Sequence, residues 1–184
     1  MSTLAPAVQT TWQVDPTHSH VEFAVRHLMI STVKGRFAEV TGTLTGDEHD
    51  PDNASIVLTI PVAGIDTRDD RRDAHLRSPD FFEAETYPSI RFRSTRITRA
   101  GDGVFTVGGD LSIRDVTRPL VLTAHSGGSV RDPWGGDRTG YSATTRINRK
   151  DFGLNWNQAL ETGGVLVGDE VTISIELELL KTSN

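Results

Sequence analysis

The stretch Val171–Leu179, with the sequence VTISIELEL, alternates apolar and polar residues along its whole length. Successive side chains of a β-strand point to opposite faces, so this alternation predicts a strand with one apolar and one polar face. A short strand is expected at 12–15, and seven further stretches share the alternation, near 21–26, 34–46, 54–62, 89–98, 103–114, 117–126 and 138–147. Eight antiparallel strands of this kind hide their apolar faces most simply by closing into a barrel. The pattern therefore predicts an all-β protein, an eight-stranded antiparallel β-barrel.

Residues 64–88 depart from the alternation. Asp66-Thr67 can cap a helix over Arg68–Leu76, because their side-chain oxygens can accept hydrogen bonds from the first free amides. Pro79–Phe82 is expected to form a second turn or helix. The barrel should therefore carry one or two short helices on this segment.

The remaining segments connect or extend the barrel. Residues 148–168 form a long connection before the last strand, at 169–181. Residues 1–11 contain no alternation and are expected to be a loose tail. We expect a single domain over 12–182, since the chain shows no repeat and no low-complexity segment.

Composition excludes several classes of function. The chain has 184 residues, a net charge of −6 and no cysteine. Thiolate metal sites and thiol nucleophiles are absent, and the acidic balance argues against nucleic acid as a partner. No stretch approaches the roughly 20 apolar residues of a membrane span. Met1–Thr11 lacks the features of a signal peptide, so we expect a cytoplasmic protein.

The apolar faces of the predicted strands would meet inside the barrel. A last strand over 169–181 would extend about 40 Å, so the barrel would be tall and could hold an elongated ligand. The alternative is that side chains fill the interior completely, and the glycine at 109 either permits a bend or leaves space there. If the interior holds a ligand, the residues expected to line it are Phe23, Val25, Ile56, Leu58, Phe92, Phe105, Val107, Leu111, Ile113, Leu122, Ile147, Val171, Ile173 and Ile175, with Trp156 from the 148–168 connection near the mouth.

Three cationic side chains are candidates to bind an anionic head group: Arg72, His75 and Arg149. Arg72 and His75 lie three residues apart and would share a face of the predicted helix. Arginine binds phosphate or carboxylate as a bidentate fork, and histidine is a tunable donor. The alternatives are a solvated helix with internal ion pairs and Leu76 turned toward the barrel mouth, and an ordinary turn around Arg149.

A metal site or catalytic centre has weaker support. His18 and His20 would share a face of a strand, but no third ligand is apparent, and zinc needs three or four. We therefore expect these histidines to make structural hydrogen bonds, and we predict no metal, no cofactor and no catalytic residue. An enzyme built on the barrel would need an acid or base inside it, for which the candidates are His75, His27 and Asp15.

Several segments, in order, resemble the YceI-like family. They are Trp12-x-Val14-Asp15, His18-Ser19-x-Val21-x-Phe23, Val25-Arg26-His27-Leu28, Val33-x-Gly35-x-Phe37, Ile65-Asp66-Thr67, Arg72-Asp73-Ala74-His75-Leu76-Arg77-Ser78-Pro79-Asp80-Phe81-Phe82, Tyr87-Pro88-x-Ile90-x-Phe92, Asn148-Arg149-x-Asp151-Phe152-Gly153 and Asp169-Glu170-Val171. The resemblance implies a lipocalin-like barrel with a lid of short helices. It also implies binding of polyisoprenoid lipids, such as isoprenoid quinones or prenyl phosphates, and a homodimer. The family supplies no catalytic residues to transfer.

Three hypotheses follow. The first is binding, sequestration or transport of a long apolar lipid in the barrel lumen. The second is a terpenoid-modifying enzyme of the isomerase or cyclase type, and the third is a ligand-free structural or stress-associated dimer. A cavity inside the barrel, and the groups that line it, would distinguish the three.

Overall fold

The computed structural model describes residues 9–47 and 49–182. The expected tail over 1–11 falls mostly on residues 1–8, which lie outside the described residues, and the first strand begins at Thr11. The elements are β1 (Thr11–Val14), β2 (His20–His27), β3 (Ser31–Phe37), β4 (Thr41–Asp47), β5 (Asp50–Pro61), η1 (Val62–Gly64), β6 (Ile65–Asp66), α1 (Asp70–Arg77), β7 (Ser89–Gly101), β8 (Val104–Ile113), β9 (Val116–Arg131), β10 (Asp137–Asn148), η2 (Arg149–Phe152) and β11 (Val167–Lys181).

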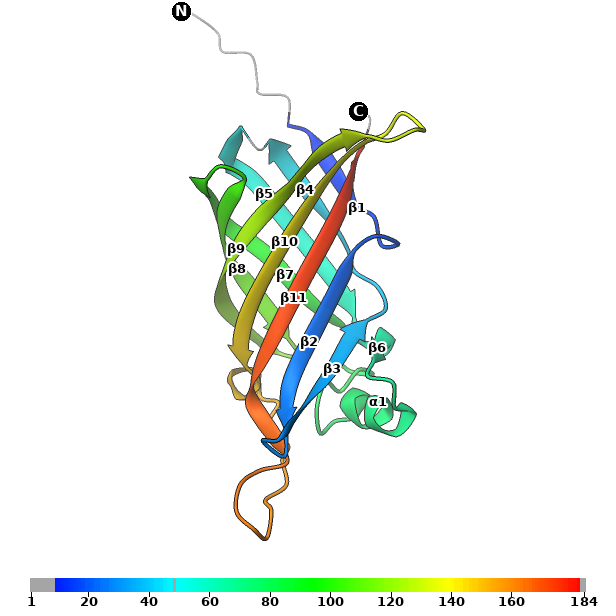
Figure 1. Cartoon of the computed structure of the whole chain (residues 1–184), viewed down its shortest axis with the longest axis vertical. Coiled ribbons are helices and arrows are strands. Elements are labelled where there is room, and N and C mark those ends of the chain that lie inside the picture. The colour runs from blue at the N-terminus through cyan, green and yellow to red at the C-terminus, as the bar shows by residue number, and fades with distance from the viewer. Residues whose placement is uncertain (1–8, 48, 183–184) are drawn as a thin grey trace, which may run out of the picture.

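Eight strands close into an antiparallel barrel, as the alternation predicted (Figure 1). The order around the barrel is β1-β4-β5-β7-β8-β9-β10-β11, and β1 closes the ring because it also pairs with β11. Strand β2 pairs with β11 further along, from Val167 to Glu176, and β3 and β6 follow it. β1 and β2 are therefore two halves of one edge along β11, interrupted at 15–19.

The run predicted at 34–46 is divided in a similar way. β3 and β4 are separated at 38–40, and they pair with different neighbours: β4 with β5, and β3 with the two-residue strand β6. Helix α1 contacts β6 and lies at this end of the barrel (Figure 1). The barrel therefore differs at its two ends, and only the end near α1 carries a helical segment among the described residues.

Helix α1 begins two residues later than the sequence predicted. Asp69, and not Asp66-Thr67, caps it, because the Asp69 side chain accepts hydrogen bonds from the amides of Arg71 and Arg72. Asp66 instead accepts from the amide of Arg68, which lies in the left-handed region at φ 64°. Residues 79–82 form a turn, one of the two outcomes expected for them.

The glycine at 109 is explained by a neighbouring ring. A Cβ atom at this position would lie 2.4 Å from the Phe92 ring and 2.6 Å from the Arg93 carbonyl oxygen. Phe92 and Leu111 are partners on β7 and β8, so the Phe92 ring lies over the glycine two residues before Leu111. The glycine therefore leaves room for an aromatic side chain inside the barrel, and it lies opposite a β-bulge in β7 between Ser94 and Arg96.

Candidate ligand-binding cavity

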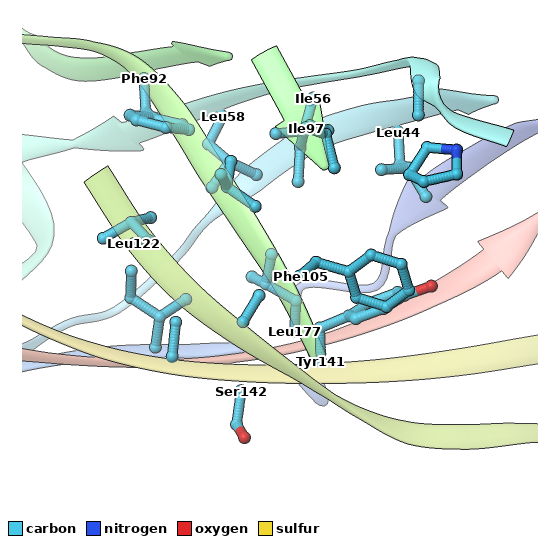
Figure 2. A pocket seen from close by; sticks show the side chains of 16 residues that line it. Leu44, Ile56, Leu58, Phe92, Ile97, Phe105, Leu122, Tyr141, Ser142 and Leu177 are labelled. Atoms are coloured by element: carbon cyan, nitrogen blue, oxygen red, sulfur yellow. The ribbon is translucent and has the colours of Figure 1, made fainter. Parts of the chain in front are cut away.

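Two apolar cavities lie inside the barrel. The upper cavity, drawn in Figure 2, has a volume of about 90 Å³, and the lower cavity has a volume of about 150 Å³. Four residues line both cavities and separate them: Leu58, Phe92, Leu122 and Ile175. We call these four residues the waist. These residues belong to β5, β7, β9 and β11, so four different strands of the barrel form the waist.

The walls of both cavities are almost wholly apolar. Leucine, isoleucine, valine, phenylalanine and alanine side chains make up most of the upper cavity, where the hydroxyl-bearing residues are Tyr141 and Ser142. Leu, Ile, Val and Phe likewise dominate the lower cavity. A cavity of about 150 Å³ with such walls stays dry and can bind an apolar molecule of benzene size. The interior is therefore suited to hydrocarbon and offers few groups to orient a polar ligand.

The structure places fourteen of the fifteen predicted lumen residues on these cavities. Ile56, Phe105 and Val107 line the upper cavity, the four waist residues line both, and the lower cavity is lined by Phe23, Val25, Leu111, Ile113, Ile147, Val171 and Ile173. Trp156 lines neither, and packs instead on His75 and Phe81. Contact of these residues with a ligand stays a prediction.

Sequence reasoning missed the residues that close the lower end. Phe81, Phe82 and Leu154 line the lower cavity but lie outside the strands. Period-two alternation cannot find such residues, and the available signal was the apolar pair Phe81-Phe82 between two prolines. Leu76 does turn toward the barrel interior, as one of the alternatives held.

Two segments that we call caps cover the lower cavity. The helical cap comprises residues 70–88, and the loop cap comprises residues 149–166. They meet through three rings: the centroid of His75 lies 4.6 Å from that of Trp156 and 5.1 Å from that of Phe81, and Phe81 lies 5.4 Å from Trp156. These ring contacts join the two caps over the lower end of the barrel.

The helical cap is fastened to the barrel by arginines. Arg114, in the turn between β8 and β9, donates to the Phe81 carbonyl oxygen at 3.2 Å and to Glu83 at 2.9 Å. Arg72 donates to the hydroxyl and carbonyl oxygens of Thr67 at 2.7 and 2.8 Å. The buried carboxylate of Asp73 accepts from the amide and hydroxyl of the same Thr67.

The three candidate head-group residues are engaged with the protein itself. Arg72 holds Thr67, as described, and His75 Nε2 lies 2.8 Å from an Asp80 carboxylate oxygen. Arg149 lines the lower cavity but is 3 % exposed, and its guanidinium donates to four backbone carbonyls of the loop cap and the start of β11. Burial lowers the pKa of Arg149 from its ordinary value. The structure therefore gives Arg149 a structural task, and head-group binding by these residues stays a prediction.

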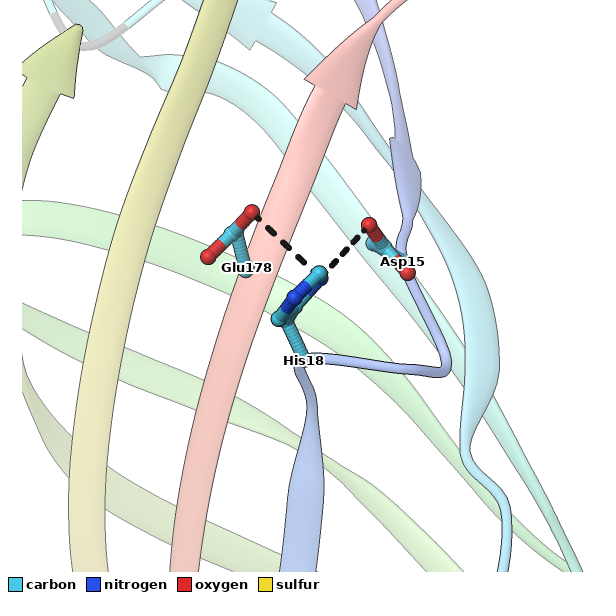
Figure 3. Close-up of side chains that lie close together, drawn as sticks. All are labelled: Asp15, His18 and Glu178. Carbon is cyan, nitrogen blue, oxygen red and sulfur yellow. Dashed lines mark hydrogen bonds and ion pairs between the residues drawn. The ribbon is translucent and has the colours of Figure 1, made fainter. Parts of the chain in front are cut away.

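His18 does not pair with His20. It lies between β1 and β2, where its Nδ1 is 3.0 Å from Asp15 and 3.8 Å from Glu178 (Figure 3). These three residues bring potential ligand atoms within 4.8 Å of one another. However, Arg138 donates to Asp15 at 2.8 Å and to Glu178 at 2.7 Å, so both carboxylates already have a cationic partner. This arrangement favours an ion-pair network over a metal site.

The acid and base candidates for an enzyme lie away from the cavities. Asp15, His27 and His75 are not among the residues that line either one. Glu22 and Arg149 are the charged residues of the lower cavity wall, and Arg149 is committed to the carbonyls described above. The described residues therefore place no free general acid or base of the three proposed in the lumen.

We predict an acid-sensitive stability from the network around Arg138. Hydrogen bonds from Thr17 and Arg138 hold the pKa of Asp15 well below its ordinary value, and Arg138 and the Gly136 amide lower that of Asp132. Carboxylates with lowered folded-state pKa values stabilise the fold above the ordinary value of about 3.9, and this contribution is lost as the pH falls further. The melting temperature should therefore decline below about pH 5.

Variants test this prediction through the pH dependence of unfolding. Arg138→Met should lower stability at pH 7 and flatten the decline between pH 5 and pH 2, measured by thermal unfolding across that range. The control is Arg146→Met, which breaks an exposed pair with Glu170 and should leave the decline unchanged. An equally steep decline in Arg138→Met would contradict the assignment.

None of the helices within residues 9–47 and 49–182 is long and apolar enough to cross a bilayer.

Comparisons with known proteins identify the family. The profile of the YceI-like domain matches residues 12–179. A UPF0312 protein of Photorhabdus laumondii is 40% identical over 135 residues, which cover 73% of this chain and 70% of that protein. The crystal structure of BcnA from Burkholderia cenocepacia has a TM-score of 0.79 at 24% identity, covering 90% of this chain and 98% of that one.

A second solved structure has the same fold. It is a polyisoprenoid binding domain from Saccharophagus degradans implicated in plant cell wall breakdown, with a TM-score of 0.69 at 16% identity. It covers 93% of this chain and 98% of that chain. At these identities the two structures establish the lipocalin-like barrel, and the sequence matches establish the family. The chain belongs to the family of YceI-like domain proteins.

Proposed function

We propose that this protein binds a long apolar lipid, with a polyisoprenoid chain lying along the barrel axis through both cavities. The observation that carries the proposal is the presence of two apolar cavities inside one barrel, whose walls share the four side chains of the waist. A chain of hydrocarbon is long and narrow, and rotation of waist side chains would join the cavities into one channel.

Burial of hydrocarbon would drive binding. Each Å² of apolar surface removed from water contributes about 25 cal/mol, less the cost of ordering the lipid and the side chains. The solved neighbour from Saccharophagus degradans is named as a polyisoprenoid binding domain, which supports the same class of ligand here. The carrier would sequester or transport the lipid; a homodimer and a cytoplasmic location remain predictions.

The two alternative functions have less support. A terpenoid-modifying enzyme needs an acid or base against the ligand, and the proposed candidates lie outside both cavities. A ligand-free structural protein predicts a filled barrel, whereas this barrel encloses cavities of about 90 and 150 Å³. Lipid binding accounts for the apolar walls and for the two caps over the lower end.

Native mass spectrometry of the purified protein, followed by solvent extraction, tests the proposal. The expected result is an added mass that solvent releases and that proves to be a prenyl chain. Adjacent residues on β9 offer a matched pair of variants, since Leu122 belongs to the waist and Val121 is 66% exposed. Leu122→Trp should fill the waist and lose the lipid, whereas Val121→Trp should retain it.

Two results would contradict the proposal. One is a ligand-free protein that also fails to bind added quinones and prenyl phosphates. The other is equal lipid retention by Leu122→Trp and Val121→Trp, since this would place the lipid outside the waist.

A further inference from the structure

The end of the barrel that carries the caps also presents exposed apolar side chains. The turn between β2 and β3 exposes 55% of Met29 and 79% of Ile30, and the loop cap exposes 37% of Val165. The two segments are adjacent, because the Leu28 amide donates to the Leu166 carbonyl oxygen at 2.9 Å. In Figure 1 the turn and the loop lie together at the lower pole. We call Met29, Ile30 and Val165 the apolar tip.

The backbone of this turn disfavours the residues that occupy it. Leu28 and Met29 have φ angles of 52° and 59°, in the left-handed region where side chains with a Cβ are strained. A tight hairpin turn with two positive φ angles favours Asn-Gly or similar pairs. Strain at Leu28 and Met29 is unfavourable for folding, and the exposure of Met29 and Ile30 to water is unfavourable for solubility. Their presence therefore indicates that these residues contact another molecule and do not serve the stability of the fold.

The apolar tip adjoins the lower cavity. Val167, which lines that cavity, pairs with His27, the residue just before the turn. Val25 lines the same cavity two residues earlier on β2. The tip, the caps and the lower end of the lumen are thus neighbours on one pole of the barrel.

Charge around the turn has the sign that phosphate head groups attract. The turn and its flanking residues, 26–34, contain Arg26 and Lys34 and no acidic residue, although the loop cap carries Glu161 and the whole chain has a net charge of −6. Arg26 lies directly behind the tip, where its guanidinium donates to the Met29 carbonyl oxygen at 2.7 Å. At a bilayer surface the phosphate groups lie just outside the hydrocarbon. An inserted apolar tip would therefore place the Arg26 guanidinium at the level of the phosphates.

We propose that the apolar tip docks on the surface of a lipid bilayer, so that the capped end of the barrel faces the membrane with which it exchanges lipid. This inference rests on the proposed function. The tip is too small for a stable dimer interface: three buried apolar side chains remove roughly 60–120 Å² each from water, against about 800 Å² per partner in a stable complex. A convex edge of this size suits insertion between head groups.

Co-flotation with lipid vesicles tests the docking. The vesicles are phosphatidylcholine alone and phosphatidylcholine mixed with phosphatidylglycerol, and the variant is Met29→Gly with Ile30→Ser. We expect the vesicle partition coefficient to fall at least tenfold, because two apolar side chains are lost. We expect the melting temperature to stay the same or rise, because glycine adopts the positive φ at residue 29 without strain. Loss of binding without loss of stability would separate docking from misfolding.

Two exposed residues elsewhere serve as matched controls. Trp134 is 86% exposed on the β9–β10 turn at the opposite pole, and Val121 is 66% exposed on the barrel wall. Trp134→Ser and Val121→Ser should keep the partition coefficient of the unaltered protein. Loss of vesicle binding in Trp134→Ser, with none in the tip variant, would overturn the proposal and assign docking to the other pole.

The remaining outcomes separate this inference from the proposed function. Native mass spectrometry of the tip variant should still show retained or added prenyl lipid, because the lumen is unchanged. If the unaltered protein retains lipid but floats with neither vesicle, docking is wrong and lipid binding stands. If sedimentation shows that the tip variant dissociates a dimer while flotation is unaffected, the tip is a self-association surface and the proposal is also wrong.

Discussion

Replacing Arg149 by methionine is expected to lower the free energy of unfolding by about 3–5 kcal/mol. The side chain is 3% exposed, and its guanidinium donates to the carbonyl oxygens of Leu154, Trp156, Val167 and Gly168. Methionine fills similar space but offers no donor, so these carbonyls lose the guanidinium, although that of Val167 keeps a hydrogen bond from the Asn157 side chain. The loop cap would then detach from the start of β11.

Thermal unfolding measures this effect. In a chain of this length each kcal/mol shifts the melting temperature by about 2–4 °C, so Arg149→Met should melt about 10 °C lower. Lys150→Met is the control, because Lys150 is 46% exposed and forms a surface pair with Asp169, which contributes little. Arg149→Lys keeps the charge without the planar fork and should be intermediate. A melting temperature of Arg149→Met within 2 °C of the unaltered protein would show that the carbonyls find other partners.

The same experiment bears on the head-group hypothesis. If Arg149→Met loses both stability and lipid, the guanidinium acts by holding the loop cap over the cavity. If Arg149→Lys restores stability but not binding of a prenyl phosphate, a direct contact with the phosphate is favoured. The comparison therefore separates the two roles of one side chain.

Replacing Phe92 by alanine is expected to lower the free energy of unfolding by about 3–5 kcal/mol, the usual cost of removing a buried phenylalanine. Phe92 is 6% exposed and belongs to the waist, and its ring lies over the glycine at 109. Its removal should leave an empty space that joins the upper and lower cavities. A prenyl chain should fill part of this space and recover part of the lost stability.

The measurement is the melting temperature with and without added prenyl lipid. The gain on adding lipid should be larger in Phe92→Ala than in the unaltered protein, because the ligand replaces contacts that the ring supplied. Trp134→Ala removes a larger side chain that is 86% exposed, and should change neither value. Equal gains in Phe92→Ala and the unaltered protein would place the lipid away from the waist.

The alternation of residues predicted which side chains line the barrel interior, because the face on which a side chain lies depends only on its position within the strand. Ile173 and Ile175 point inward whatever the rest of the chain does, once β11 has one buried face. The same logic placed residues as distant as Phe23 and Leu122 on the cavities. Trp156 was expected near the lumen mouth, and it lies in the loop cap over the lower end, but it lines neither cavity, since no periodic pattern fixes the direction of a side chain in a long connection.

Contacts between distant segments decided the features that alternation could not predict. Arg149 resembled an exposed cation beside a turn, but in the fold its neighbours are carbonyls up to 19 residues away. His18 was expected to make structural hydrogen bonds, and its neighbours Asp15 and Glu178 come together where β1 closes against β11. Such pairs form only when the barrel closes, and the residues themselves carry no local sign of them.

By itself the sequence therefore determined an all-β barrel and the side of each strand that faces its interior. It also determined the resemblance to a family with that fold. Only the tertiary structure decided that the interior holds two cavities divided by a waist, that the lower one is covered by two caps, and that an apolar tip adjoins it. The physical reason is that alternation acts between neighbours in sequence, whereas cavities, caps and surfaces depend on packing between residues far apart.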